Sequence, residues 1–219
     1  MRWSVPGLIR TLAIWGAVLS VLAAPAAVTK VRAGINSGNF TAEEWKRLDA
    51  GQLVLRPATR TQGRLRLMGG SSWQVIDAAP QVVWRALLDT PRYHRMMPQV
   101  LEARVVRAQQ NERTVFLRQG AAGLLEAKYY LRVNVHEQRR DITFTVDENM
   151  PHDVLRAAWG FYTVRPYGKG KTLLAYGVMA DIGGGMVAGL MRHNVHDWML
   201  RTPWMVKRFL EGSGRRLYR

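Results

Sequence analysis

Hydrophobic and polar residues alternate along the centre of the chain between residues 125 and 147. The odd positions from 125 to 135 are apolar, whereas the even positions are mostly charged or polar. The apolar positions are Leu125, Ala127, Tyr129, Leu131, Val133 and Val135. A period of two predicts an antiparallel strand with one buried and one wet face. Residues 141–147 repeat the pattern after a turn at 138–140, with Ile142, Phe144 and Val146 on the buried face.

Further strands are predicted on both sides of this region. Residues 171–180 have Leu174, Tyr176 and Val178 on one face. Weaker patterns predict strands near 64–76, 99–108, 112–119 and 157–165. Seven strands at short spacing, joined by hairpin turns, indicate a curved antiparallel sheet.

Three helical regions flank the strands. Thr41 and Glu44 have the spacing of a capping box and predict a short helix over 42–50 that stops at Gly51. Pro80 suits the first turn of a second helix. Its apolar stripe consists of Val83, Trp84, Leu87 and Leu88, and a further short helical turn is predicted between Pro91 and Pro98.

The longest helical pattern covers residues 186–210. Apolar positions recur at steps of three and four, at Val187, Met191, Val195, Trp198, Thr202, Met205 and Phe209. Pro203 should kink the helix or split it after Arg201. Because a sheet with one apolar face must cover that face, we expect the helix to lie in the curve of the sheet. The wedge between them, lined by large soft side chains, predicts a ligand pocket.

Residues 73–98 resemble the opening of the START/polyketide cyclase-like proteins, also called the SRPBCC or Bet v 1-like superfamily, near the coenzyme Q-binding START subgroup. The resemblance rests on a strand from Trp73, on Asp77-Ala-Ala-Pro80 leading to Trp84, and on Asp89-Thr-Pro-Arg-Tyr93 followed by Met97-Pro98. Asp181-Ile-Gly183 and a helix carrying Thr202-Pro203 fit the end of the domain. The resemblance covers about 64–210.

This resemblance implies an α+β helix-grip fold. About seven strands would wrap around a long C-terminal helix, with two short helices after the first strand. It also implies an apolar cavity for lipids, sterols, quinones or polyketides; most such domains bind or carry a ligand, and some cyclise polyketides. Fold alone does not decide between these activities.

The first 26 residues have the pattern of a secretory signal peptide. Arg2 and Arg10 precede an apolar run of 13 residues, Leu12–Ala24, and Ala24-Pro25-Ala26 forms a processing site. The run is short for a membrane span, which needs about 20 apolar residues. We therefore expect cleavage and export to the periplasm or outside the cell; the alternative is an uncleaved anchor extended through Val28. The predicted organisation is a signal peptide (1–26), a linker with a short helix (27–63), a ligand-binding domain (64–211) and a basic tail (212–219).

The amino-acid composition excludes several kinds of site and favours certain partners. The 219 residues include no cysteine, which excludes disulfides, thiol catalysis and cysteine-ligated zinc. A formal net charge of +16 favours polyanionic partners. Because export makes nucleic acid an unsuitable partner, the charge points to anionic membrane surfaces. His193 and His196 lie three positions apart on a helix, but no third metal ligand is evident, so we predict neither a metal nor a cofactor.

The apolar phases of the strands and helices predict the cavity wall. The candidates are Trp73, Trp84, Tyr93, Met97, Tyr129, Leu131, Phe144, Trp159, Phe161, Tyr176, Val187, Met191, Val195 and Trp198. Arg118 and His193 are the candidate polar groups inside the cavity. No residue is predicted to be catalytic.

Three functions fit these features. The first is an exported, monomeric binding or carrier protein for a hydrophobic small molecule, namely a lipid, quinone, sterol or polyketide-like compound. The second is a cyclase/aromatase-like enzyme that uses the same cavity, and the third is a scaffold whose wedge is filled. An enzyme needs a convergent polar cluster in the cavity, a carrier needs an apolar tunnel, and a scaffold needs neither.

Overall fold

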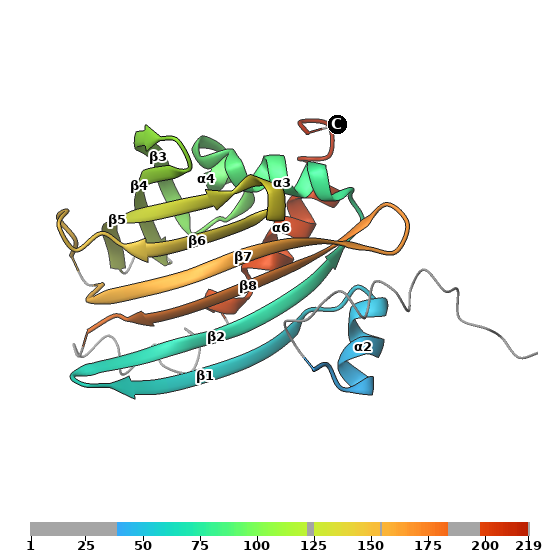
Figure 1. The fold of residues 1–219 in the computed structure, drawn as a ribbon, viewed down its shortest axis with the longest axis horizontal. Coiled ribbons are helices and arrows are strands. Elements are labelled where there is room, and N and C mark those ends of the chain that lie inside the picture. The colour runs from blue at the N-terminus through green and yellow to red at the C-terminus, as the bar shows by residue number, and fades with distance from the viewer. Residues whose placement is uncertain (1–38, 122–124, 154, 184–197, 219) are drawn as a thin grey trace, which may run out of the picture.

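One curved antiparallel sheet forms the centre of the molecule (Figure 1). The computed structural model describes residues 39–121, 125–153, 155–183 and 198–218. Within these residues the sheet has eight strands in the order β1-β2-β8-β7-β6-β5-β4-β3. The strands are β1 (Val54–Gln62), β2 (Leu65–Ile76), β3 (Val100–Gln109), β4 (Glu112–Ala121), β5 (Leu125–His136), β6 (Asp141–Val146), β7 (Ala157–Tyr167) and β8 (Lys171–Asp181). This α+β architecture confirms the predicted fold class.

The helices lie on two sides of the sheet. Helices α3 (Pro80–Leu88), α4 (Tyr93–Met96) and α6 (Thr202–Glu211) lie on its concave side, and α2 (Ala42–Asp49) packs against its convex side (Figure 1). Two short 3₁₀ turns, η1 (Thr90–Arg92) and η2 (Glu137–Arg139), complete the described elements. No helix among these residues is long and apolar enough to span a membrane.

The capping box of α2 is confirmed. The Glu44 amide donates to Thr41 Oγ1 at 3.2 Å, and the Thr41 amide donates to Glu44 Oε2 at 2.8 Å. Arg56 of β1 donates to the same carboxylate from Nη2 at 2.7 Å and from Nε at 2.8 Å. The Arg56 hydrogen bond, with that from the Thr41 backbone, lowers the pKa of Glu44 to about 2. The helix is thereby tied to the first strand.

Strand β1 was not expected from the sequence. It pairs with β2 from Val54↔Trp73 to Gln62↔Leu65, so residues 54–62 belong to the sheet and not to a linker. Most of the strand is exposed, and Pro57 lies within it. An edge strand tolerates proline because one row of its backbone amides makes no ladder bonds. Because residues on both faces of β1 are exposed, the strand lacks the alternation of apolar and polar residues that would have predicted it.

The predicted break in the C-terminal helix is confirmed. Residues 198–200 are helical, Arg201 forms a turn, and α6 begins at Thr202 with Pro203 in its first turn. Proline is tolerated there because the first amides of a helix have no partner within the helix. The part of the predicted helix before residue 198 lies outside the described residues.

The basic C-terminal tail folds back onto the domain. The Tyr218 hydroxyl donates to Asp89 Oδ2 at 2.9 Å, and the Tyr218 carbonyl oxygen accepts from Arg85 Nη2. The Tyr218 ring lies edge-on to Phe209 with a centroid distance of 6.3 Å. These contacts connect the end of the chain to α3 and α6.

Candidate ligand cavity

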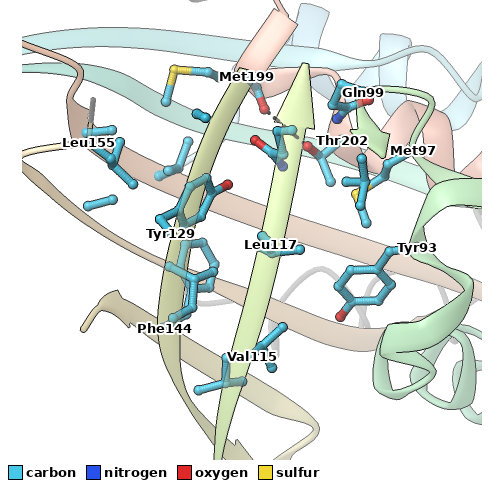
Figure 2. A pocket seen from close by; sticks show the side chains of 18 of the residues that line it. Tyr93, Met97, Gln99, Val115, Leu117, Tyr129, Phe144, Leu155, Met199 and Thr202 are labelled. Atoms are coloured by element: carbon cyan, nitrogen blue, oxygen red, sulfur yellow. Dashed lines mark hydrogen bonds between the residues drawn. The ribbon is translucent and has the colours of Figure 1, made fainter. Parts of the chain in front are cut away.

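A cavity of about 530 Å³ lies between the concave face of the sheet and the helices. Figure 2 shows Val115 and Leu117 of β4 and Tyr129 of β5 pointing into the same space, with Tyr93 and Met97 opposite them. Its volume is within the range of about 300–1,000 Å³ that is common for small-molecule sites. The wedge between sheet and helices is therefore hollow and mainly apolar.

Strand register determines which side chains face the cavity. Val115 pairs with Leu131, and Leu117 pairs with Tyr129. On β5, the odd residues Ala127, Tyr129, Leu131, Val133 and Val135 all line the cavity. The predicted alternation of this strand is confirmed, and Ile142 and Phe144 of β6 continue the same surface.

Aromatic rings form one wall of the cavity. The Tyr162 and Tyr176 centroids are 4.8 Å apart, and Phe144 lies 5.9 Å from Tyr162 and 6.4 Å from Tyr176. Burial raises the pKa of Tyr129, Tyr162 and Tyr176 well above the usual value for a phenol. Burial also raises the pKa of Tyr93 to about 12. These phenols stay neutral across the physiological range, and their hydroxyls are hydrogen-bonding groups in an otherwise apolar wall.

The raised tyrosine pKa values predict alkaline destabilisation. Above pH about 10 the unfolded chain loses phenol protons that the folded protein retains, so the free energy of unfolding should fall with rising pH. Denaturant unfolding at several pH values should show a nearly constant free energy between pH about 6 and about 9 and a decline toward pH about 12. Phenolate absorbance should appear together with unfolding. Ionisation of all seven tyrosines near pH 10 in a protein that remains folded would contradict this.

Seven of the predicted wall residues line the cavity. They are Tyr93, Met97, Tyr129, Leu131, Phe144, Tyr176 and Trp198. Val187, Met191, Val195 and His193 lie outside the described residues.

Four predicted wall residues lie elsewhere. Ala158 and Tyr162 of β7 face the cavity, so Trp159 and Phe161 between them point to the convex side. Trp73 also lies on the convex side, in a cluster with Leu48 and Phe161. Trp84 is a buried residue of α3 itself, and its Nε1 donates to Glu137 Oε2 at 2.9 Å. The prediction for Trp159 and Phe161 was therefore one residue out of phase on β7, and the prediction for Trp73 placed it on the wrong face of β2.

Arg118 is not a cavity group. It occupies the outer phase of β4, its side chain is 36% exposed, and it forms ion pairs with Glu102 at 3.6 Å and Glu126 at 3.4 Å. Other polar residues from several elements do line the cavity. They are Thr90, Gln99, Arg113, Gln119, Glu126, Asp153, Arg156 and Thr202. Arg113 and Gln119 share the phase of Val115 and Leu117, and this alternation could have identified them from the sequence.

The described residues contain no group of three histidine or carboxylate side chains that could hold a metal ion. The cavity therefore offers apolar contact, neutral hydroxyls and a few charged groups. A curved antiparallel sheet that encloses such a cavity against a C-terminal helix defines a hydrophobic-ligand-binding domain of the START/Bet v 1-like class.

The family model described as "Polyketide cyclase / dehydrase and lipid transport" matches residues 76–202. This match covers more than half of the chain, so the chain belongs to that family. Comparison with curated protein sequences finds no match.

Solved structures share the fold at low sequence identity. A protein from Thermus thermophilus superposes with a TM-score of 0.55 at 17% identity, covering 67% of this chain and 94% of that one. A STAR-related lipid transfer protein fragment from Xanthomonas axonopodis has a TM-score of 0.53 at 16% identity, covering 71% and 98%. The di-domain ARO/CYC StfQ from the steffimycin biosynthetic pathway has a TM-score of 0.52 at 14% identity, covering 67% and 46%.

Proposed function

We propose that this protein is an exported, monomeric carrier for a hydrophobic small molecule such as a lipid, quinone, sterol or polyketide-like compound. The observation that carries the proposal is the 530 Å³ cavity, whose centre is lined by aliphatic and aromatic side chains. Such a space binds ligands mainly by removing their apolar surface from water. The lipid transfer protein named among the structural relatives supports the same function.

A cyclase/aromatase activity is the second candidate, because one structural relative is named an ARO/CYC protein. Cyclisation needs a base that can remove a proton from the substrate. The phenols of Tyr129, Tyr162 and Tyr176 are held in their protonated form by burial and are unsuited to that role. Among the described residues lining the cavity, the carboxylates are Glu126 and Asp153; both residues are exposed, and Glu126 forms an ion pair with Arg118. This arrangement favours a carrier.

Ligand extraction tests the carrier directly. Protein purified from its native cell should release a hydrophobic compound on organic extraction, and native mass spectrometry should show the corresponding mass on the intact protein. The emptied protein should then bind Nile red, a neutral apolar dye, at micromolar concentration. Absence of both a co-purifying compound and dye binding would overturn the proposal.

Export has its own test. The basic start, the apolar run Leu12–Ala24 and the site Ala24-Pro25-Ala26 support removal of a signal peptide. N-terminal sequencing of protein from the native cell should find a mature end near Ala27, in the periplasmic or secreted fraction. A soluble cytoplasmic protein that begins with Met1 would rule out export.

The basic surface is proposed to attract anionic membranes for ligand exchange. Exposed apolar side chains lie beside arginines at Val105 and Val106 on β3 and at Trp204 on α6, where Arg208 lies 4.8 Å from the Trp204 ring. We expect binding to phosphatidylglycerol vesicles that weakens with added salt, because charges are screened within about 10 Å at 0.1 M. Phosphatidylcholine vesicles are the control. Equal binding to both vesicles, or binding insensitive to salt, would contradict an electrostatic mechanism.

A further inference from the structure

One arginine occupies an inward position on a strand that is otherwise apolar on that face. Arg113 pairs with Val133 in the β4–β5 ladder, two residues before the Val115↔Leu131 pair. Alternate residues of a strand point to the same side, and Arg113, Val115, Leu117 and Gln119 all line the cavity. The guanidinium therefore belongs to the cavity wall and not to the basic outer surface.

Arg113 makes one hydrogen bond with the described residues. Its Nη1 donates to the Leu88 carbonyl oxygen at 3.3 Å, at the C-terminal end of α3. No carboxylate among the described residues lies within ion-pair distance of Arg113. A guanidinium has five N–H donors, and the described residues accept a hydrogen bond from only one of them.

Three other arginines of the sheet, one each on β4, β5 and β7, form ion pairs. Arg118 pairs with Glu102 and Glu126, Arg132 with Asp147 at 3.3 Å, and Arg165 with Asp141 at 2.7 Å. Of these four arginines, Arg113 alone lines the cavity. A half-buried cation beside apolar side chains is unfavourable unless a charged or polar partner satisfies it.

Four charged side chains of the described residues line the cavity, namely Arg113, Glu126, Asp153 and Arg156. Thr90 and Tyr93 lie near the Arg113 end, and Tyr93 Oη donates to the Leu87 carbonyl oxygen at 2.5 Å. Glu126, Asp153 and Arg156 supply two carboxylates and one guanidinium at other points of the wall. Because Glu126 is paired with Arg118, and Asp153 and Arg156 carry opposite charges, we expect the strongest attraction for an anionic group at Arg113. The strand from Arg113 to Gln119 spans about 20 Å, which leaves room for an apolar body beyond the anionic group.

We propose that Arg113 binds the carboxylate of an amphipathic ligand whose apolar body lies along Leu117, Tyr129 and Phe144 (Figure 2). This inference rests on the proposed carrier function and specifies its ligand class. A planar guanidinium can form two parallel hydrogen bonds with a carboxylate, which gives both strength and orientation. The Leu88 carbonyl would hold the guanidinium in place, since a cation is favoured at a helix C-terminus.

A matched set of probes tests the assignment. Displacement of Nile red from the purified protein at neutral pH should show that dodecanoate binds at least about 10-fold more tightly than methyl dodecanoate. Arg113→Gln should weaken dodecanoate binding about 10- to 100-fold and leave the methyl ester and Nile red little changed. Arg113→Lys should retain part of the preference for the acid. Arg107→Gln removes the same charge from an exposed position on β3, outside the cavity lining, and should change none of these affinities.

The outcomes separate the two proposals. Wild-type protein that binds Nile red but does not prefer the acid overturns the Arg113 assignment and leaves the carrier function intact. Equal loss of acid and ester binding in folded Arg113→Gln assigns Arg113 a structural role at the end of α3 and also overturns it. If Arg113→Gln does not fold, the acid–ester preference of the wild type and of Arg113→Lys decides. Wild-type protein that binds no probe at all overturns the carrier function itself.

Discussion

Replacement of Ala127 by tryptophan is expected to abolish Nile red binding without unfolding the protein. Ala127 lies on β5 opposite Gln119, and both side chains line the cavity. An indole at this position would occupy space that the ligand needs, and we expect the apparent dye affinity to fall by about 100-fold, or about 2.7 kcal/mol. Overpacking a filled core costs about 1–3 kcal/mol, but a hollow site should accept the ring for less. Dye titration and thermal unfolding measure the two quantities.

Lys128→Trp is the control for Ala127→Trp. It places the same side chain at the next residue of β5, which is exposed on the opposite face. Dye binding should therefore be retained. If Ala127→Trp unfolds the protein while Lys128→Trp does not, the wedge is filled in solution and the scaffold function gains support.

Replacement of Trp73 by alanine is expected to destabilise the protein by about 3–5 kcal/mol without changing its affinity for the dye. Trp73 is only 4% exposed. The Phe40 ring lies edge-on at 5.2 Å, and the Arg56 guanidinium lies 5.1 Å from the indole. These partners are on the convex side, so removal of the indole should leave a void between α2 and the sheet. Chemical denaturation gives the stability change, and dye titration gives the affinity.

Tyr129→Ala should reduce stability less than Trp73→Ala and, unlike it, should change the affinity for the dye. Tyr129 already faces open space on one side, so its removal enlarges an existing cavity and should cost less stability than the loss of Trp73. Dye affinity should change, because part of the contact surface is lost. A dye affinity that depends on Trp73 and not on Tyr129 would place the binding site on the convex side.

Sequence patterns identified the cavity-facing residues where one face of a strand is wet. On β5, Lys128, Arg132 and Asn134 separate the apolar positions, so the inward phase was evident from residue types alone. On β7, the outer residue Phe161 packs against the α2 cluster and the inner residue Tyr162 lines the cavity. When both faces are covered, both carry aromatic residues, and periodicity cannot choose between them.

Other features depended on contacts that no local pattern records. Strand β1 is mostly exposed and contains Pro57, so its pairing with β2 had no apolar signal. The tail was expected to be a basic extension, yet the distant partner Asp89 holds Tyr218 against the domain. Arg113 was overlooked because a charged residue on a strand is usually assigned to the surface, although the neighbouring Val115 and Leu117 share its phase.

The two faces of the sheet carry separate hydrophobic clusters. The convex layer of α2, Trp73 and Tyr167 forms a small cluster away from the cavity, whereas the concave layer holds both the larger core cluster and the hollow. Because the two clusters are separate, changes to the cavity wall should leave the convex cluster intact. Such a separation makes the domain a suitable starting point for directed evolution, in which side chains bordering the hollow are randomised for new ligands. The convex cluster and the buried concave residues away from the hollow, such as Val83 and Leu210, would be kept to maintain the fold.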